Sequence, residues 1–497
     1  MAVWYVVLIF VISFLTILIS KKCRLKKQFP GPKGTPVIGV IWGLDLASLH
    51  LKLYEWSKLY GDIFQFSCLG KKFLVINSSV VLRELFLKEP NSTITADRPE
   101  TFFGNYIYKN SDVVFASSDH KWARRRKLMY KLLHAYGEGL VDVERQIRYN
   151  LHSLTEEIRL LQNGTIDPSN IVEEFILNTI EVLLVGRSYG RHGELQCLLG
   201  KMQPVVNEIA NLGPDIVYST FPVLRFLPLP TSRKIKDFIK MKSDMMEILD
   251  RLSCGEPVGV YRALKDATTE RDAAGERWFT ADNHWTMIHD IITGGHLSTK
   301  GTLLSLIHIL AKRPDIQKSI QSEIDNVIGV DREPVLADRQ HCPLVTAVIL
   351  ETLRYISHLP IVTHNTSKPT HIDGIPVERN TTIIVNLWTM HHNAKEWDIP
   401  FVFKPERFLH ADGSLLPSTN TIRKRMLAFG VGKRGCVGDV FAMSRIFLFV
   451  STLLQHFTIL EPKDEPLPDL LPRDLDPGVV LQTKPFKVRF VKRNNRY

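Results

Sequence analysis

The chain has 497 residues, of which 44% are hydrophobic, and it can therefore bury a large core. Its formal net charge of +11 comes without any nucleic-acid-binding motif, so we expect anionic lipid or an acidic protein, and no nucleic acid, as partner of its basic surface. Its six cysteines form no C-x-x-C pair and no zinc-spaced cluster, which indicates a reducing compartment.

An apolar run begins the chain. Residues 2–19 are interrupted only by Ser13 and Thr16, and the run is about as long as a helix that spans a bilayer. Basic residues follow at once, and the positive-inside rule places them in the cytosol: Lys21, Lys22, Arg24, Lys26 and Lys27. We predict a transmembrane anchor at 1–20, a basic stop-transfer and proline-rich hinge at 21–36, and one cytosolic domain at 37–497.

The first half of the predicted domain contains a β-hairpin and then long helices. Segments 61–66 and 72–76 flank Gly70 and have the composition of strands, which predicts the hairpin. Between about 120 and 355, apolar residues recur at helical spacing with few strand signals. Trp122 and Arg126 stand four residues apart there, so a helix would place both side chains on one side.

One predicted helix is unusually long and has two glycines at its middle. It runs from His284 to Lys312 and ends at the following Arg313-Pro314. Residues 293–299 read Thr-Gly-Gly-His-Leu-Ser-Thr. Because each glycine inside a helix costs roughly 1 kcal/mol relative to alanine, the pair is expected to have a function.

The last third of the chain combines a helix, a β-rich segment and a short basic motif. Glu351 and Arg354 are three residues apart and share one face of a predicted helix. The segment 370–387 is rich in strand formers and contains a turn at 373–374. Pro-Glu-Arg-Phe follows at 405–408. The sum is a mainly α fold with small β-sheets.

Cys436 lies in the stretch 429–438, which reads Phe-Gly-Val-Gly-Lys-Arg-Gly-Cys-Val-Gly. Glycines let a backbone approach a flat, bulky group closely and adopt positive φ. A helix is predicted just afterwards, from Asp439 to Phe457. Turn amides near a helix start lower the pKa of a thiol and favour the thiolate. A thiolate presented in this way can bind haem iron and favour cleavage of the O–O bond.

This stretch resembles the cytochrome P-450 signature F-x-x-G-x-R-x-C-x-G. Its five fixed positions are matched by Phe429, Gly432, Arg434, Cys436 and Gly438. Residues 29–497 are similar to the microsomal subgroup that contains steroid 17-hydroxylases and aryl-hydrocarbon hydroxylases. The resemblance implies the cytochrome P-450 fold and haem b with the Cys436 thiolate as axial ligand. It also implies a monooxygenase that acts on a lipophilic, steroid-like or aromatic molecule.

The resemblance implies roles for further residues. The family's buried charged triad, which would secure the cysteine loop, is represented by Glu351, Arg354 and Arg407. Positions that contact the haem propionates are held by Trp122, Arg126, His364 and Arg434, and Phe429 and Gly438 complete the cofactor-binding set. NADPH-cytochrome P-450 reductase, with cytochrome b5 as a further electron donor, would dock on Lys121, Arg124, Arg125, Lys127 and Lys433.

The long helix departs from the family pattern A/G-G-x-D/E-T-T, whose glycines let the helix approach haem and dioxygen. Aligned on the glycines, this chain has Leu297 at the acidic position and Ser298 at the first threonine. Leu297 cannot relay a proton, whereas Ser298 keeps a hydroxyl. His296 could substitute for the acid, although its side chain points about 100° away from the acid's direction on a helix. The candidate catalytic residues are Ser298, Thr299 and His296.

Two other functions stay open because of Leu297. A haem-thiolate isomerase or dehydratase would need no reductase, and some relatives of that kind lack the acid–threonine pair. A haem protein that binds ligands without catalysis is the third candidate. A similar Gly-Gly-His sequence occurs in the insect spook-type members of the family. In all three cases we expect a single-pass protein of the endoplasmic reticulum membrane whose domain faces the cytosol.

Overall fold

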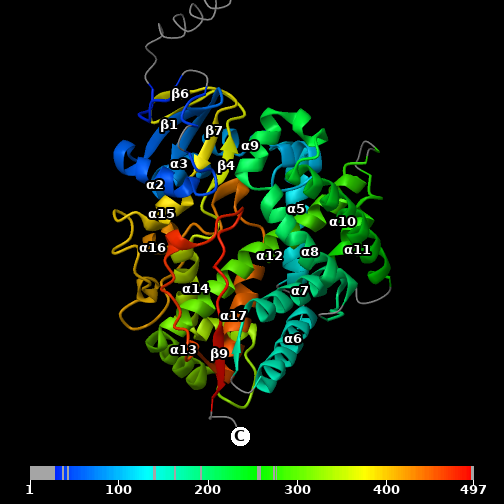
Figure 1. Cartoon of the computed structure of the whole chain (residues 1–497), viewed down its shortest axis with the longest axis vertical. Coiled ribbons are helices and arrows are strands. Elements are labelled where there is room, and N and C mark those ends of the chain that lie inside the picture. The colour runs from blue at the N-terminus through cyan, green and yellow to red at the C-terminus, as the bar shows by residue number, and fades with distance from the viewer. Residues whose placement is uncertain are drawn as a thin grey trace, which may run out of the picture.

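The computed structural model describes residues 28–493, apart from 36–37, 42–43, 138–140, 162–163, 191–192, 255–258, 272–274 and 276. Helices make up most of this part of the chain, and three small sheets complete it (Figure 1). The fold is mainly α with small β-sheets, as the spacing of apolar residues predicted.

The helices surround a long central one, α12 (Figure 1). Their bounds are α2 Leu49–Tyr60, α3 Ser79–Leu87, α4 Asn91–Ile94, α5 His120–Gly137, α6 Val141–Leu160, α7 Ser169–Val185, α8 Glu194–Ile209, α9 Leu212–Thr220, α10 Pro230–Leu252, α11 Val260–Ala267, α12 Ala281–Lys312, α13 Pro314–Val327, α14 Pro343–Ile356, α15 Leu387–His392, α16 Thr421–Arg425 and α17 Asp439–His456. Short 3-10 turns lie at Pro222–Phe226, Leu336–His341, Pro405–Phe408, Gly432–Arg434 and Pro472–Asp474, and a π-turn at Phe103–Ile107.

The strands form three separate sheets. The largest has the order β1-β2-β7-β4, in which β2 and β7 are parallel and the other neighbours antiparallel. The second has the order β3-β9-β8, and the third pairs β5 with β6. The bounds are β1 Ile63–Cys68, β2 Lys71–Ile76, β3 Thr165–Ile166, β4 Val362–Asn365, β5 Thr370–Ile372, β6 Ile375–Val377, β7 Thr382–Val385, β8 Phe457–Leu460 and β9 Val488–Lys492.

Helix α12 begins three residues before the predicted start because a capping box fixes its first turn. The Thr280 side chain accepts from the Asn283 N–H at 3.3 Å, and the Asn283 side chain accepts from the Thr280 N–H at 2.9 Å. The helix ends before Pro314, which opens α13 because proline has no N–H for a continuing helix. The predicted end at Lys312 is confirmed.

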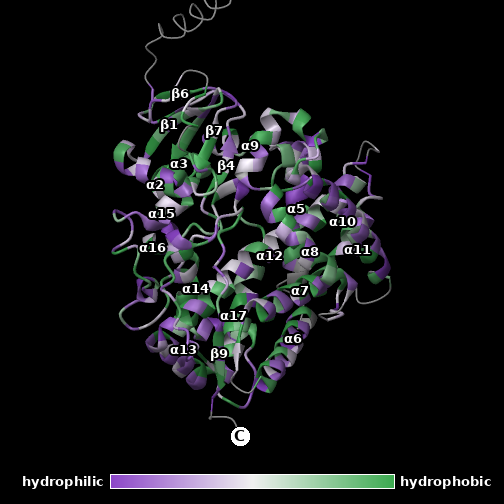
Figure 2. Ribbon diagram, in the orientation of Figure 1, coloured by the Kyte–Doolittle hydropathy of each residue, from purple (hydrophilic) through white to green (hydrophobic). Residues whose placement is uncertain are grey.

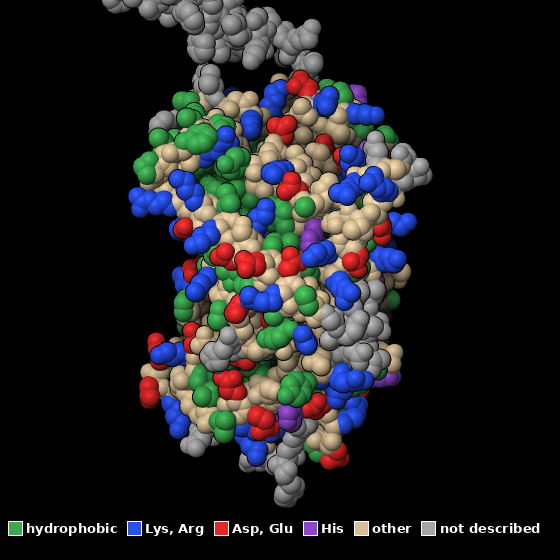
Figure 3. All heavy atoms as spheres, turned by 90° about the vertical axis from the view of Figure 1, so that its right-hand side faces the viewer, with side chains coloured by type: hydrophobic (Ala, Val, Ile, Leu, Met, Phe, Trp, Pro, Cys, Tyr) green, Lys and Arg blue, Asp and Glu red, His purple; other side chains and the backbone are tan. Residues whose placement is uncertain are grey.

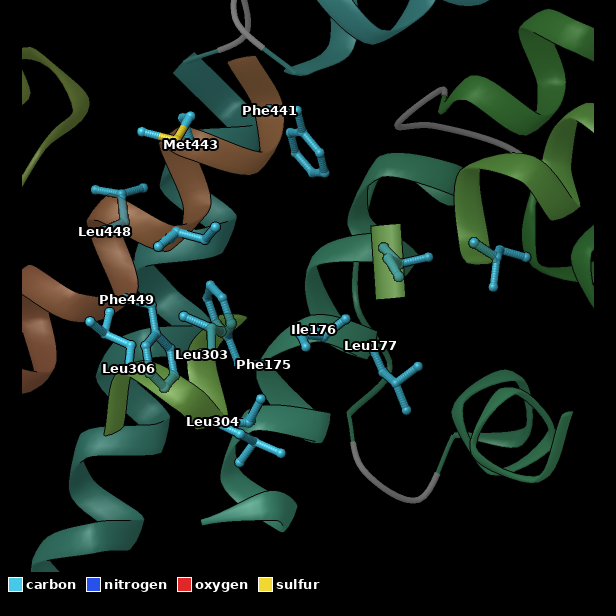
Figure 4. Packing of buried hydrophobic residues seen from close by; sticks show 14 of the residues in the cluster. Phe175, Ile176, Leu177, Leu303, Leu304, Leu306, Phe441, Met443, Leu448 and Phe449 are labelled. Atoms are coloured by element: carbon cyan, nitrogen blue, oxygen red, sulfur yellow. The ribbon is translucent and has the colours of Figure 1, made fainter. Parts of the chain in front are cut away.

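Helices α7, α12 and α17 share the main hydrophobic core. Phe175, Leu303, Leu306 and Phe449 gather in Figure 4, and the rings of Phe175 of α7 and Phe449 of α17 have centroids 4.8 Å apart. The outer helices α6 and α10 carry both hydrophobic and hydrophilic residues, as expected for elements with one face in water (Figure 2). This packing fixes α17, which follows Cys436, against the middle of α12.

The predicted membrane anchor at 1–20 lies outside the described residues, as does most of the hinge at 21–36. Among the helices of the described part, none has the length and hydropathy that crossing a bilayer requires. The anchor therefore stays a prediction from the sequence.

Candidate active site

The loop before α17 is folded back on itself around Cys436. The Cys436 N–H donates to the Phe429 carbonyl at 2.7 Å, and the Gly438 N–H donates to the Cys436 sulfur at 3.3 Å. Gly432 has φ +72°, and a Cβ there would lie 2.3 Å from the backbone oxygen of Phe86 in α3. Glycine at 432 is thus required by both conformation and close contact with α3.

The Cys436 thiol is accessible and yet lies deep in the fold. Its side chain is exposed by accessible surface, and yet burial is the main cause that raises the pKa of its thiol. Accessible surface and a pKa raised by burial occur together when a side chain is surrounded by protein but has open space next to it. The expectation of a net lowered thiol pKa is wrong, because the Gly438 N–H and the charges of Arg126 and Arg445 lower it by less than burial raises it.

Three of the residues matched to propionate contacts meet beside this loop. The guanidinium of Arg434 lies 3.9 Å from the ring centroid of Trp122 and donates to the carbonyls of Ala96, Val113 and Ala116. The Trp122 indole N–H donates to Val113 O at 3.0 Å. Arg126 donates to the carbonyl of Gly435 at 2.6 Å and so contacts the cysteine loop directly.

Arg98 joins this cluster and was missed in the sequence. Its Nε donates to Val114 O at 3.0 Å and its Nη1 donates to Thr363 O. It precedes a proline in the loop after α4, where no helical or strand periodicity marks it. An arginine next to an aspartate in a loop is ordinarily a surface pair, so sequence reasoning had no ground to select it.

His364 lies on β4, next to Thr363, whose carbonyl accepts a hydrogen bond from Arg98. Its Nδ1 donates to Thr95 O at 2.9 Å, and its ring meets that of Phe86 edge to face at 4.4 Å. Burial, and next the charge of Arg98, hold the pKa of His364 well below its usual value, so the imidazole is neutral. The hydrogen bond to the Thr95 carbonyl gives His364 a structural role, because it joins β4 to the end of α4.

The cluster carries more positive charge than its surroundings neutralise. Burial and then the charge of Arg98 lower the pKa of Arg434 to about 8, and burial lowers the pKa of Arg98 to about 10. Asp97 and Asp112 act in the opposite direction but leave the net effect downward. A partly buried set of guanidiniums in this state fits a ligand with two carboxylates, as haem has, because charge-assisted hydrogen bonds would stabilise both partners.

The predicted charged triad is formed. Arg354 makes two parallel bonds to Glu351, both 2.7 Å, and Arg407 Nε lies 3.2 Å from a Glu351 oxygen. Glu351 and Arg354 have no exposed surface. Arg354 also donates to His391 O at 2.8 Å, and His391 Nε2 accepts the Leu427 N–H at 3.0 Å. The triad therefore reaches the start of the cysteine loop through His391.

The open side of α12 carries Gly294 and Ser298. Gly294 is exposed in the middle of a helix that is otherwise mostly buried, and a Cβ there would meet no atom within 4 Å. The Ser298 hydroxyl donates to Gly294 O at 2.8 Å. Packing within the protein does not explain a glycine at 294, whereas a bound group next to this face would.

The other two candidate catalytic residues point elsewhere. His296 is 1% exposed and its Nε2 lies 2.7 Å from a carboxylate oxygen of Glu173 in α7. Thr299 is also buried, and its hydroxyl accepts from Arg445 of α17. Lys300 pairs with the other oxygen of Glu173 at 2.7 Å. Within this set, Ser298 is the side chain that lies on the same face as Gly294.

The basic residues proposed for docking divide into two groups. Lys121, Arg124 and Lys127 are exposed on α5, and Lys433 is exposed beside Glu89, 2.9 Å away. Arg125 is 5% exposed and donates to the carbonyls of Asp112 and Asn110. The prediction that Arg125 belongs to the docking surface is wrong, because α5 directs this side chain into the core.

Comparison with known proteins gives the family. Residues 29–490 match the model of the family described as Cytochrome P450. The chain is 31% identical to "Steroid 17-alpha-hydroxylase/17,20 lyase" of Gallus gallus, over 92% of this chain and 91% of that protein. It is 29% identical to the protein of the same name from Ictalurus punctatus (92% and 90%) and 28% identical to "Cytochrome P450 1A2" of Cavia porcellus (98% and 96%). The chain belongs to the cytochrome P450 family, oxidoreductases of the monooxygenase class that bind haem through a cysteine thiolate.

Proposed function

We propose that Cys436 is the axial ligand of haem b and that Arg98, Arg126 and Arg434 hold its propionates. The observation that carries this is the accessible thiol deep in the fold, next to a cluster of partly buried guanidiniums. A bound haem-thiolate supplies cleavage of dioxygen and transfer of one oxygen atom. The space beside Gly294 would hold the lipophilic substrate, which we propose to be steroid-like or aromatic; the steroid agrees with the name of two of the relatives.

The chain's own residues would bring a proton to that space. Ser298 is placed to orient it, because its hydroxyl is held by Gly294 O on the open face of α12. Leu297 is 5% exposed and offers no proton, so a water next to Ser298 would take the part of the usual acid. His296 and Thr299 would act through others, since their side chains bond to Glu173 and Arg445.

We propose NADPH-cytochrome P-450 reductase as the electron donor, with cytochrome b5 as a second donor. The exposed basic residues Lys121, Arg124 and Lys127 lie on α5, the helix whose Arg126 contacts the cysteine loop, and would attract an acidic partner. We further propose that residues 1–20 anchor the protein in the endoplasmic reticulum membrane. Exposed hydrophobic side chains after α9 would add contact with lipid: Phe221, Val223, Phe226 and Leu227.

Reconstitution with reductase tests this function. The purified protein, reductase and NADPH are incubated with a panel of steroids and planar aromatics under labelled dioxygen. We expect NADPH consumption that rises with a substrate, and a product that carries one labelled oxygen atom. Product without the label would contradict the proposal.

Leu297 in place of an acid favours a second candidate, a reductase-independent isomerase or dehydratase. The same experiment separates the two, since this candidate turns over a hydroperoxide and consumes no NADPH when reductase is present. A Leu297→Asp variant that gains activity absent from the parent would instead identify the parent as a haem protein that only binds ligands.

A further inference from the structure

Arg445 connects the helix that follows Cys436 to the middle of α12. It stands nine residues after the cysteine and is 1% exposed. Its Nη2 donates to the carbonyl of Gly295 and to the hydroxyl of Thr299, one turn apart on α12. Figure 4 shows how closely α17 and α12 approach in the neighbouring core.

This guanidinium lacks the partners that a buried charge ordinarily has. Its Nε and Nη1 have no hydrogen-bond partner, and no carboxylate pairs with it among the residues that the structure describes. Among the described residues, the group whose negative charge would raise the pKa of Arg445 is the sulfur of Cys436, in its thiolate form. Burial lowers the pKa of Arg445 to about 9, which leaves it protonated at neutral pH.

The other fully buried arginine shows what is missing. Arg354 is held by two bonds to Glu351, which cancels its charge. An uncompensated buried charge is strongly destabilising, so Arg445 needs a negative group that the protein alone does not supply. The sulfur of Cys436, three residues before α17, could supply this negative charge as a thiolate together with the cofactor that it would bind.

The position on α12 adds to this. Leu297, the residue that stands where the family pattern has an acid, lies between Gly295 and Thr299 in the sequence. The chain therefore lacks a negative charge in this turn of α12 and has a positive charge fixed against it. Both differences change the local electrostatic potential in the same direction.

We propose that Arg445 is a positioning residue that holds an uncompensated positive charge beside the cysteine ligand and thereby raises the reduction potential of the bound iron. The inference rests on the proposed role of Cys436 as haem ligand. Reduction adds one negative charge to the haem-thiolate unit, and a nearby cation in a medium of low dielectric favours that state. The same charge favours the thiolate over the thiol.

Redox titration of the holoprotein tests the proposal. Arg445→Gln keeps amide donors for Gly295 O and Thr299 but removes the charge, and Arg445→Lys keeps the charge as matched control. We expect the glutamine variant to keep the thiolate-type carbon-monoxide spectrum while its ferrous-to-ferric ratio at fixed potential falls about tenfold, or about 59 mV for a one-electron couple. The lysine variant should stay within about threefold of the parent. Equal potentials in parent and glutamine variant would overturn the proposal.

A second pair covers the case in which Arg445→Gln fails to fold. Thr299→Asp would give the guanidinium a carboxylate partner and cancel its charge, while Thr299→Asn has the same shape without the charge. The aspartate variant should have the lower potential, and equal potentials for the two would again overturn the inference. If the parent itself shows no thiolate-type spectrum, the proposed haem site fails, which is a separate outcome.

Discussion

At the scale of single residues, two glycines of the candidate site are glycine for different reasons. Gly432 must be glycine because a Cβ would collide with the backbone of Phe86. Gly294 of α12 has open space in front of it instead. Gly432 therefore serves the packing of the cysteine loop on α3, whereas Gly294 keeps open the space beside α12.

Ser298→Ala should separate oxygen use from product formation. Without the hydroxyl, proton delivery loses its oriented group, so product formed per NADPH should fall roughly tenfold or more while haem content stays unchanged. Product and NADPH are measured in the same reconstituted reaction.

Ser298→Thr is the matched control, since it keeps a hydroxyl at this position and should keep most of the coupling. If alanine and threonine variants couple NADPH to product equally well, Ser298 has no part in proton delivery.

How far the sequence predicts the site depends on the kind of signal. Cys436 and Arg434 come from one short motif and Glu351 and Arg354 from another, so local spacing was enough to select these four residues. Arg98 could not be selected, because its meeting with Arg434 joins segments over 330 residues apart. The contacts of Arg445 are equally invisible in the sequence, since they need two helices in register.

At the scale of elements, long helices and hairpins with tight turns are predictable. The hairpin β1–β2 turns at Leu69 and Gly70, both with positive φ, and the segment 370–387 contains β5, β6 and β7 as expected. β4, which carries His364, lies outside the strand segments predicted from the sequence. Such a four-residue strand exists through its pairing with β7 and carries no periodic signal of its own.

Glu351→Gln should loosen the element that supports the cysteine loop. Removal of this carboxylate leaves the buried guanidinium of Arg354 unpaired, a change that costs roughly 3–5 kcal/mol. We expect a lower midpoint of thermal unfolding and reduced haem content. Glu406→Gln, on the neighbouring exposed residue, is the control and should change neither. If Glu351→Gln unfolds at the same temperature as the parent, the triad does not support the loop.

Glu173 connects α7 to α12, and it should make the free energy of unfolding depend on pH in the acid range. Burial raises its pKa, but His296 and Lys300 lower it by more, to about 2. A carboxyl with a lowered folded-state pKa stabilises fully above its unfolded value of 4.5, and this stabilisation is lost as the pH falls from 4.5 to about 2. Chemical unfolding of Glu173→Gln should show a deficit of about 3 kcal/mol at most at pH 7. The deficit should shrink below pH 4.5, and a pH-independent one would contradict this assignment.

At the scale of the whole molecule, charged residues of both signs cover the face seen in Figure 3, with hydrophobic side chains gathered near its upper end. The net positive charge alone therefore predicts no docking site. A basic surface close to the cysteine loop is the more useful criterion for one. Helix α5 meets it, because Arg126 bonds to Gly435.

Reversal of charge on α5 tests that docking surface. Lys127→Glu should lower the initial rate of reduction by reductase several-fold at low salt, with a smaller difference at high salt. Lys318→Glu, an exposed lysine on α13, is the control and should leave the rate unchanged. Equal effects of the two variants would show that only net charge matters.

The difference spectrum of the dithionite-reduced, carbon-monoxide-treated protein tests the central claim most directly. If the Cys436 sulfur holds the iron, the purified parent has the Soret maximum of thiolate-ligated haem. Cys436→Ser loses that maximum, whereas Cys342→Ser, a buried cysteine that the site does not use, keeps it. A parent without this maximum, or a Cys436→Ser protein that retains it, would contradict the account.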